Sequence, residues 1–337
     1  MSYVIITPVR NEGAHFHQTL ESVLAQTLRP LAWVIVDDGS TDITPQLVDA
    51  VAAQHPWIHA VHRTDRGFRQ QGSGVIEAFY DGYAKLATLG SNSAPSLPSE
   101  GRGVRGEGSS SSAAWSFLVK LDGDLSFASD YFEQCFSRFV ADPKLGIAGG
   151  RVYCRRNGAT VEDSPGDPSF HVRGATKIYR RECWDQLGGL VRAPGWDTLD
   201  EVKANMLGWK TCSFPDLRLL QLKPTGSADG SWRNWVKNGR ANYTSGYHPL
   251  FMLLKCLKRT VEKPYGIAAL GLFTGFCAGY LRRLPQVPDP GLIRYLRRQQ
   301  MNRLLGKRSL WSSPSLQHSN TPSRRASITP APHSANG

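Results

Sequence analysis

The sequence predicts an α/β fold in which a mostly parallel β-sheet has helices on both faces. Two observations point to this fold. Residues 3–86 alternate between short apolar runs rich in β-branched residues and segments whose apolar residues have helical spacing. Forty per cent of the 337 residues are hydrophobic, which is enough for a large buried core. Because strands and helices alternate, we expect consecutive strands to run mostly parallel.

The individual elements follow from local residue patterns. The run YVIITPV at residues 3–9 is typical of a buried strand, and the Thr-Pro pair at residues 44 and 45 is a common helix start. In chain order, we expect a strand at 3–9, a helix at 15–27, a strand within 31–42, a helix at 44–55, a strand at 58–63, a helix at 74–86 and a strand within 115–124.

Two segments have a composition that disfavours folding. Residues 88–114 and 309–337 consist largely of small and polar residues with Gly and Pro. Such segments bury too little apolar surface to offset the entropy lost on ordering. We therefore expect one domain at residues 1–250 with a disordered insertion at 88–114, a basic and apolar helical region at 251–308, and a disordered tail at 309–337.

The chain is strongly basic, with a formal net charge of +12 and a pI of about 9.6. This excess favours a polyanionic partner, either nucleic acid, an anionic membrane face or a phosphorylated substrate. The six cysteines show no paired spacing, which argues against a zinc site and for reduced thiols. The first residues read as a strand, so we expect no signal peptide.

Acidic residues follow two of the predicted strands. Asp37 and Asp38 end the strand within 31–42, and Asp122 and Asp124 follow the strand that begins near residue 115. The carboxyl ends of parallel strands line one crevice, where carboxylates can hold a ribose, a base or a hard divalent cation. Asp and Gly also dominate ordinary turns, so either motif alone is weak.

Several motifs in this order resemble the inverting family 2 glycosyltransferases, which have the Rossmann-like GT-A fold. The resemblance covers residues 1–250 apart from the insertion, and is close to bacterial enzymes that build exopolysaccharides and cell-surface glycans. The motifs are TPVRNEG at 7–13, VIVDDGSTD at 34–42, DGD at 122–124, RGATKIYRRECWDQLGGL at 173–190 and GWDTLDEVKANMLGWKT at 195–211.

The resemblance implies roles for the matching residues. Pro8, Arg10 and Glu12 would line the nucleotide pocket, and Asp38 would hold the base. Asp122 and Asp124 would bind the ribose and diphosphate of the donor through Mg²⁺ or Mn²⁺. Gly174 would let the backbone approach the donor sugar.

Two arginines are weaker candidates for contacts with the diphosphate. Arg69 precedes a Gly-rich turn that opens a helix, and helix N-termini attract phosphate. Arg240 lies in SWRNWVKNGRANY, where processive relatives carry a Gln-x-x-Arg-Trp motif that is absent here. An ordinary helix start and a basic amphipathic helix are the respective alternatives.

An inverting transfer needs a general base for the acceptor hydroxyl. Counting back from Gly208 and Trp209, Asp197 falls at the position of the family's base, but Trp196 replaces the Glu that usually precedes it. Asp200 and Glu201 lie about one turn further on and remain alternatives. An acidic helix N-terminus, favoured by the helix dipole, would account for one of these three acids.

Residues 264–281 carry no charge and are flanked by Lys and Arg on both sides. A membrane span, an interfacial segment and a buried core helix all remain open. Gly271, Gly275 and Gly279 form a small-residue face that allows close helix packing. With the basic charge, the segment predicts an anionic membrane partner and a place at the cytoplasmic face of the inner or plasma membrane.

The resemblance therefore implies a metal-dependent, hexosyltransferase-type enzyme. It would move a sugar from a nucleotide-diphosphate sugar, most simply a UDP-sugar, to a glycan or polyprenyl-linked acceptor. A transferase-like scaffold, a nucleotidyltransferase and a basic nucleic-acid-binding protein are the alternatives. Since no helix-turn-helix, RRM or zinc-finger pattern is present, we expect no nucleic-acid partner.

Overall fold

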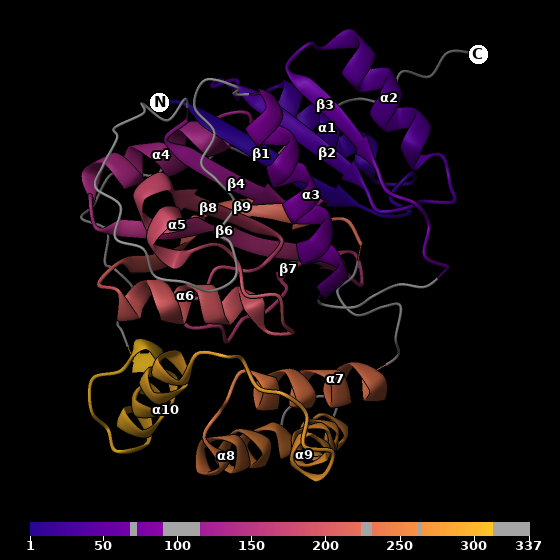
Figure 1. The fold of residues 1–337 in the computed structure, drawn as a ribbon. Helices are drawn as coiled ribbons and strands as arrows, with labels where there is room; N and C mark the ends of the chain where they lie inside the picture. The colour runs from indigo at the N-terminus through magenta and orange to yellow at the C-terminus, as the bar shows by residue number, and fades with distance from the viewer. Residues whose placement is uncertain (68–72, 90–114, 224–230, 262–264, 313–337) are drawn as a thin grey trace.

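The computed structural model describes residues 1–67, 73–89, 115–223, 231–261 and 265–312 (Figure 1). The described strands join in one sheet with the order β3-β2-β1-β4-β8-β6-β9-β5, and β7 pairs with β6 at its side. Their bounds are β1 Tyr3–Val9, β2 Ala32–Asp37, β3 Ile58–His62, β4 Phe117–Leu121, β5 Leu125–Phe127, β6 Leu145–Arg156, β7 Ala159–Glu162, β8 Thr176–Arg180 and β9 Lys210–Gln221.

The sheet is mixed, which corrects the expectation of a mostly parallel one. The first four strands along the sheet, β3, β2, β1 and β4, are parallel as predicted. Beyond them, β8 pairs antiparallel with β4 and with β6, while β9 runs parallel to β6 and antiparallel to β5. The change of direction occurs because β8 enters the sheet from a loop rather than after a crossover helix.

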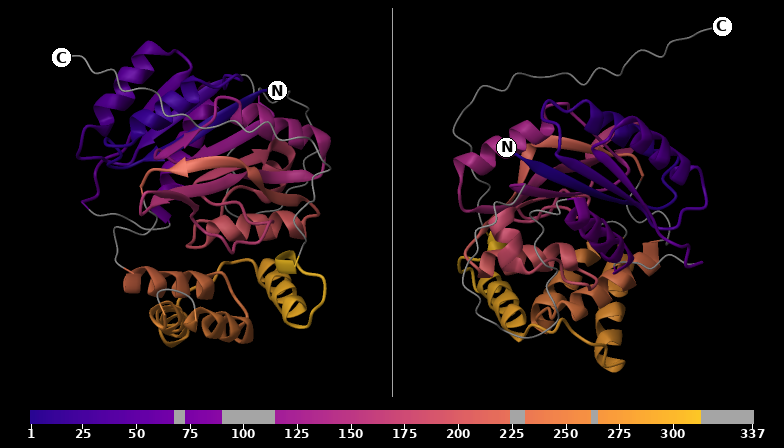
Figure 2. Two further views of the ribbon diagram at one scale, coloured as in Figure 1. Left: turned by 180° about the vertical axis from the view of Figure 1, so that it is seen from behind. Right: turned by 45° about the horizontal axis from the view of Figure 1, so that its top comes forward.

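Helices cover both faces of the sheet, as the alternating pattern predicts (Figures 1 and 2). On one face α1, α2 and α4 pack against alternate strand residues such as Tyr3 and Ile5; on the other, α3, α5 and α6 pack against Val4 and Ile6. The bounds are α1 Phe16–Leu24, α2 Thr44–Gln54, α3 Ser73–Leu89, α4 Tyr131–Ala141, α5 Arg181–Leu187 and α6 Trp196–Met206.

Four C-terminal helices form a further layer, on the side of α6 that faces away from the sheet (Figures 1 and 2). Leu199 and Val202 of α6 belong to the apolar core of this layer, whereas Trp196 and Ala204 of the same helix belong to the sheet core. The helices are α7 Ser231–Thr244, α8 Pro249–Thr260, α9 Ile267–Leu281 and α10 Pro290–Leu304, followed by the 3₁₀ turn η1 Leu310–Ser312.

The predicted domain limits need three adjustments. Helix α7 packs against α9, so the helical layer begins at Ser231 rather than at residue 251. The ring of Trp311 lies 5.2 Å from that of Phe170, so residues 309–312 of the predicted tail belong to the packed structure. Within the predicted insertion 88–114, Thr88 and Leu89 are the last residues of α3 and not disordered, because the helix continues to Leu89. The predicted disorder of residues 90–114 and 313–337 lies outside the described residues.

The three glycines of α9 form its contact with α7. A Cβ added at Gly271 would lie 2.7 Å from Trp235 Cβ, and one at Gly275 would overlap the backbone carbonyl oxygen of Val236. The small-residue face therefore brings these two helices together, as its spacing predicts. Within the described part of the chain, no helix is long and apolar enough to cross a membrane.

Gly275→Ala is expected to lower the free energy of unfolding by about 1–3 kcal/mol, because the added methyl group meets backbone that cannot move independently. The neighbouring exposed residue Thr274 supplies a matched control, since Thr274→Ala should change stability by less than about 0.5 kcal/mol. Urea denaturation followed by circular dichroism measures both. Equal stability of the two variants would contradict the close crossing.

Candidate active site

Parallel strands bring the predicted donor-binding residues to one edge of the sheet. Val9 at the end of β1 pairs with Asp37 at the end of β2, and β4 runs parallel to β1 on its other side. Arg10, Asp38 and Asp122 follow these three strands and therefore lie along the same edge. This is the crevice at the carboxyl ends of the strands where α/β sheets bind ligands.

Side chains tie together the loops that follow β1 and β2. The N–H of Asn11, whose φ is 52°, donates to Ser40 Oγ at 2.9 Å, and Asn11 Oδ1 accepts from the N–H of Thr41 at 2.8 Å. Gly39 has a φ of 71°, and a Cβ at this position would lie 2.5 Å from Asp65 Cα. The DDGS turn therefore requires glycine at its third position.

The predicted base-binding residue Asp38 is held by arginines. Arg63 Nη1 lies 2.5 Å from Asp38 Oδ1, and Arg66 Nη2 lies 2.6 Å from Asp38 Oδ2. Arg10 donates to the backbone carbonyl of Asp38, and its other Nη lies 2.7 Å from Asp65 Oδ1. These contacts fix the orientation of a buried carboxylate at the mouth of the crevice.

The other predicted donor residues have different surroundings. Pro8 is buried within β1. Arg240 is exposed on α7, and among the described residues its side chain forms no hydrogen bond or ion pair with the carboxylates at the strand ends. Arg69 lies outside the described residues.

The DGD motif at residues 122–124 connects β4 to β5. Asp122 Oδ1 accepts from the ammonium group of Lys120, whereas Asp124 is only 6% exposed. Burial raises the pKa of Asp124 to about 7, and repulsion from Asp122 and Glu12 adds to the rise. Carboxylates that repel one another in a poorly hydrated place favour a bound cation.

The end of β9 covers this group of carboxylates. Lys223 Nζ lies 3.1 Å from Glu12 Oε1, and Gln221 Nε2 donates to Asp124 Oδ2 at 3.1 Å. Glu12 Oε2 is buried and has no hydrogen-bond partner among the described residues. Burial raises the pKa of Glu12, and the charge of Lys223 offsets part of that rise.

The segment before β8 joins the DGD motif to α6. Lys120 Nζ donates to the carbonyl oxygen of Gly174 at 2.5 Å as well as to Asp122. A Cβ at Gly174 would lie 3.1 Å from Trp196 Cζ2 and 3.4 Å from Asp197 Cβ. Glycine at residue 174 therefore allows the predicted base to approach the segment that holds the DGD motif.

Asp197 is half-buried in the first turn of α6. Burial acts to raise its pKa, but the charges of His171, Lys177 and Arg173 outweigh burial, so the pKa lies below its usual value. The helix dipole favours the ionised form in the same way. Asp197 is therefore a carboxylate at neutral pH and can accept a proton.

The two alternative bases, Asp200 and Glu201, are fully engaged inside the protein. Asp200 is 1% exposed and bonds Lys177 Nζ at 2.8 Å and the Tyr179 hydroxyl at 2.5 Å. Glu201, with no exposed surface, lies 2.9 Å from Lys177 Nζ and 2.8 Å from His171 Nδ1. Both carboxylates are buried and engaged in ion pairs, so Asp197 is the most accessible of the three predicted acids.

Trp196, which stands where the family has Glu, contacts two buried lysines. Its ring centroid lies 5.6 Å from Lys120 Nζ and 5.5 Å from Lys177 Nζ. Cation–π contacts of this kind are favourable where the ammonium groups have lost water. Trp196 therefore joins the lysine beside the DGD motif to the lysine beneath Asp197.

Sequence reasoning did not single out Lys120, Lys177 or Lys223. A signal was present for Lys120, which is a lysine inside the otherwise apolar strand FLVKL at 117–121; the signal is weaker for Lys177, because its strand TKIYR at 176–180 also contains Thr176 and Arg180. A lysine buried in such a run requires an acidic partner. No comparable signal marks Lys223, which follows β9 and meets Glu12 only in the folded chain.

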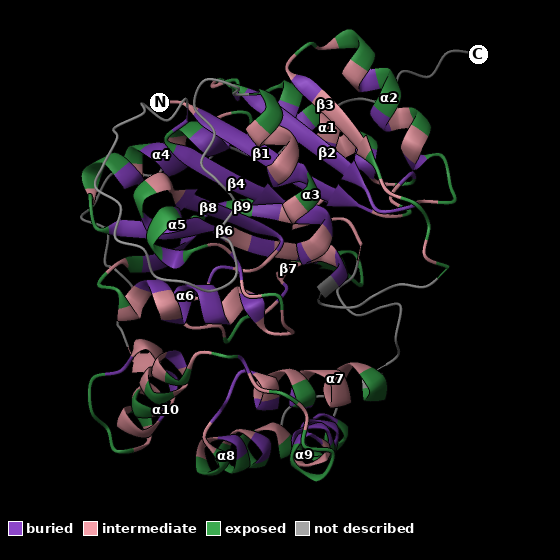
Figure 3. Ribbon diagram, in the orientation of Figure 1, coloured by how far each residue is buried: buried purple, intermediate pink, exposed green. Residues whose placement is uncertain are grey.

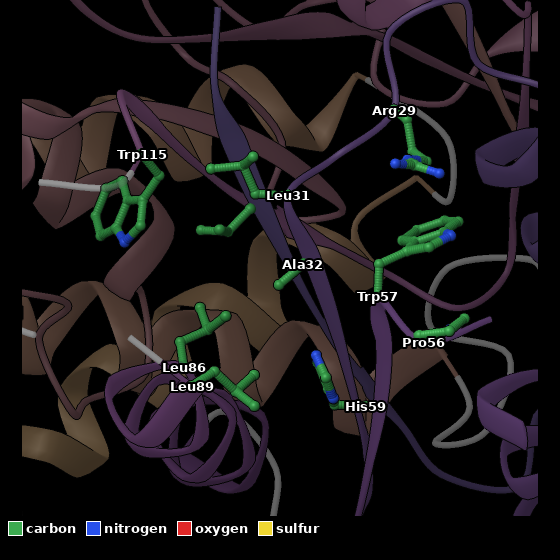
Figure 4. A pocket seen from close by; sticks show the side chains of 10 residues that line it. Arg29, Leu31, Ala32, Pro56, Trp57, His59, Leu86, Leu89 and Trp115 are labelled. Carbon is green, nitrogen blue, oxygen red and sulfur yellow. The ribbon is translucent and has the colours of Figure 1, made fainter. Parts of the chain in front are cut away.

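Neither a metal-ligand cluster made by the protein alone nor the cavity at the beginning of the strands coincides with these carboxylates in the described residues. No group of three or more His, Cys, Asp or Glu residues there is arranged to hold a metal ion by itself. A cavity of about 570 Å³ is lined by Trp57, Trp115 and Leu86 among others (Figure 4). Its lining residues Val4 and Ala32 stand where β1 and β2 begin, at the opposite edge of the sheet from the carboxylates.

Comparison with known proteins confirms the family resemblance for the first part of the chain. Residues 4–75 match the model of glycosyl transferase family 2. The glycosyltransferase GlyG of Streptococcus pneumoniae serotype 4 is 28% identical over 71 residues, which are 21% of this chain and 24% of that protein. The uncharacterized glycosyltransferase YibD of Escherichia coli K12 is 32% identical over 63 residues, 19% and 18% of the two chains.

The fold is similar to that of a solved transferase structure. The crystal structure of GalNAc-T7 with UDP, GalNAc and Mn²⁺ superposes with a TM-score of 0.53 at 14% identity, covering 88% of this chain and 56% of that one. The similarity concerns the fold, which is of the GT-A type with a mixed sheet. The chain spans about a quarter or less of the length of the two curated relatives that it matches.

Proposed function

We propose that this protein, whose residues 4–75 match glycosyl transferase family 2 and whose fold is GT-A-like, is a sugar transferase. It would transfer a sugar from a nucleotide-diphosphate sugar to an acceptor hydroxyl, with inversion at the anomeric carbon. One observation carries the proposal. The DGD motif and Asp197 lie on either side of Gly174, joined through Lys120. A sugar donor held at the DGD motif would therefore face Asp197, the proposed base.

The nucleotide would bind along the edge formed by the loops after β1 and β2. Asp38, oriented by Arg63 and Arg66, supplies acceptors for a base N–H, and Arg10 closes the same corner. We propose UDP as the nucleotide, because GalNAc-T7 has been solved with UDP on a similar fold. Lys223 lies beside the carboxylates, and its ammonium group supplies a positive charge for the diphosphate.

The residues at the DGD motif fit a divalent cation. Mg²⁺ and Mn²⁺ take oxygen ligands, and Mg²⁺ is usually held by one or two carboxylates together with substrate phosphates. Asp122 and Asp124 provide that donor set, and Glu12 Oε2 lies unpartnered in the same acidic group. When bound, the cation would neutralise charge on the departing diphosphate.

The half-buried carboxylate of Asp197 supports a role as general base in the proposed transfer step. This carboxylate takes the proton of the acceptor hydroxyl as that oxygen bonds the anomeric carbon from the side opposite the diphosphate. The bond between the anomeric carbon and the diphosphate oxygen breaks, and its electron pair leaves on the nucleoside diphosphate. Lys177 holds the backbone carbonyl of Asp197 in place during this step.

We further propose that the acceptor is a glycan or a polyprenyl-linked sugar used in exopolysaccharide or cell-envelope synthesis, at the cytoplasmic face of the membrane. The basic helical layer beside α6 supports an acceptor carried by an anionic surface. Nucleic acid is not part of this proposal.

Thermal unfolding with Mn²⁺ and UDP, GDP, dTDP or CDP tests the donor site. A ligand at a hundredfold excess over its dissociation constant stabilises the protein by about 2.7 kcal/mol, a shift of about 4 °C for a chain of 337 residues. We expect the shift with UDP, its loss in EDTA, and its loss in Asp124→Asn. A folded protein that responds to none of the nucleotides would contradict the proposal and favour a transferase-like scaffold.

A further inference from the structure

The positive charge of the chain is concentrated in its C-terminal helices. Residues 231–308 contain 15 of the 40 Lys and Arg residues but only two of the 28 Asp and Glu residues, a formal charge of +13. Residues 1–230, with 23 basic and 26 acidic residues, have a formal charge of −3. The basic character therefore belongs to the helical layer and not to the sheet domain that holds the candidate active site.

The same layer exposes a set of large apolar side chains. On α8 and just after it they recur every three or four residues, and on α9 they lie away from the glycine face. Their exposed fractions run from 41% at Leu254 to 85% at Leu281. We call this set the α8–α9 surface: Leu250, Leu253, Leu254, Leu257, Val261, Tyr265, Ile267, Leu270, Phe273 and Leu281.

The opposite sides of both helices are buried. Met252 and Cys256 of α8 and Leu272 and Phe276 of α9 lie in the core of the helical layer, and the glycines of α9 contact α7. Helices α8 and α9 pack side by side and form the part of the layer that lies furthest from the sheet (Figures 2 and 3). Their exposed sides therefore face outward, with exposed Lys258 on α8 and exposed Arg282 and Arg283 directly after α9.

We propose that the α8–α9 surface docks on an anionic lipid bilayer. Apolar side chains on helices lying in the interface enter the acyl boundary while neighbouring Lys and Arg side chains meet the headgroups. Monomeric proteins rarely expose apolar patches of this extent without a partner. Because the helical layer carries a formal charge of +13, the partner that fits this surface is an anionic one, here an anionic bilayer.

Other occupants fit the surface less well. A second copy of the chain would bring two surfaces of the same strong positive charge together. The C-terminal segment 313–337 offers only Leu316 and Ile328 as large aliphatic side chains, and residues 90–114 offer only Leu97 and Val104. Neither segment has the apolar side chains to cover ten exposed ones.

This inference does not depend on the proposed transfer reaction, but it complements it. Helix α6 carries Asp197 and packs directly against the helical layer. A bilayer at the α8–α9 surface would lie on the far side of that layer from the sheet. A lipid-linked acceptor would then reach the base from the membrane.

Flotation of the full-length protein with two kinds of vesicle tests the proposal without donor or acceptor. We expect binding to vesicles of phosphatidylcholine with 30% phosphatidylglycerol, and weaker binding to pure phosphatidylcholine. Leu257→Ser/Phe273→Ser should reduce partitioning into the anionic vesicles at least about 30-fold, from the apolar area removed. Arg282→Gln/Arg283→Gln should reduce it by a similar factor, about 30-fold, on anionic vesicles only.

Ile43→Ser/Val140→Ser is the matched control, because both side chains are large, apolar and exposed but lie outside the helical layer. This variant should bind as the unmodified protein does. Thermal unfolding of each variant checks that the fold is intact. Absence of vesicle binding by the folded protein, equal effects of control and test variants, or a dimer in solution that Leu257→Ser/Phe273→Ser dissociates would each overturn the proposal.

Discussion

Asp197→Asn is expected to lower kcat by about 10²–10⁴-fold, the range for loss of a general base. The amide cannot take the proton of the acceptor hydroxyl, yet it has nearly the same shape as the carboxylate. The donor residues lie across Gly174 from this side chain. The shift in melting temperature caused by UDP and Mn²⁺ should therefore stay within about 1 °C of that of the unmodified protein.

Two controls separate catalysis from folding. Asp185→Asn alters an exposed carboxylate on the adjacent α5, which pairs only with Arg181 on its own helix among the contacts of the structure, and should leave kcat unchanged. Asp200→Asn should lower stability more than it lowers kcat per folded molecule, because Asp200 is bonded inside the protein. Full activity of Asp197→Asn would remove Asp197 from the mechanism.

The pH dependence has a definite sign for the same residue. Because the pKa of Asp197 lies below its usual value of about 4, the carboxylate remains ionised well below neutral pH. Loss of activity through this group should therefore begin only under acid conditions, below about pH 4. In Asp197→Asn the residual activity should show no such acid limb.

Lys177→Met is expected to lower the free energy of unfolding by about 3–5 kcal/mol, because it leaves buried carboxylates without their counter-ion. Lys177 Nζ lies 2.8 Å from Asp200 and 2.9 Å from Glu201, and none of the three side chains is exposed. Burial alone lowers the pKa of Lys177, but its acidic neighbours outweigh burial and hold it as an ammonium group. Urea denaturation gives the stability of the variant.

The exposed pair Lys210–Asp142 supplies the comparison. Its Nζ–Oδ2 distance of 2.7 Å is as short as in the buried pairs, but the Lys210 side chain is 54% exposed. Lys210→Met should therefore cost about 1 kcal/mol or less. Lys177→Met/Asp200→Asn/Glu201→Gln should recover part of the loss. Equal losses of unfolding free energy in Lys177→Met and Lys210→Met would contradict the prediction that burial of the charges determines the loss.

The first half of the sheet was predictable because its determinants are local. The apolar spacing that marks the strand at 3–9 and the helix at 44–54 is visible within each segment's own residues. Strands β1, β2 and β3 accordingly fall within the expected ranges. The second half depends on contacts that no local pattern encodes. The mixed direction arises where β8 joins β4, and that pairing is a tertiary contact.

The candidate site likewise has a part that local motifs predicted and a part that depends on tertiary contacts. Motifs predicted roles for Asp38, Asp122, Asp124 and Asp197, since their residue types and order are visible in the chain, and these roles stay predictions. What the motifs left open was which acid of Asp197, Asp200 and Glu201 faces the crevice. Our proposal of Asp197 depends on a tertiary contact: Lys177 of β8 pairs with Asp200 and Glu201, whereas Asp197 is half-buried at the helix start.

The position of α6 between two apolar cores has a consequence for the size of the catalytic unit. Trp196 and Ala204 point into the sheet core, and Leu199 and Val202 into the core of the C-terminal helices. If the chain were cut before Ser231, Leu199 and Val202 would face water, on the helix that positions Asp197. The C-terminal helices are thus part of the smallest fragment expected to keep Asp197, the proposed base, in place.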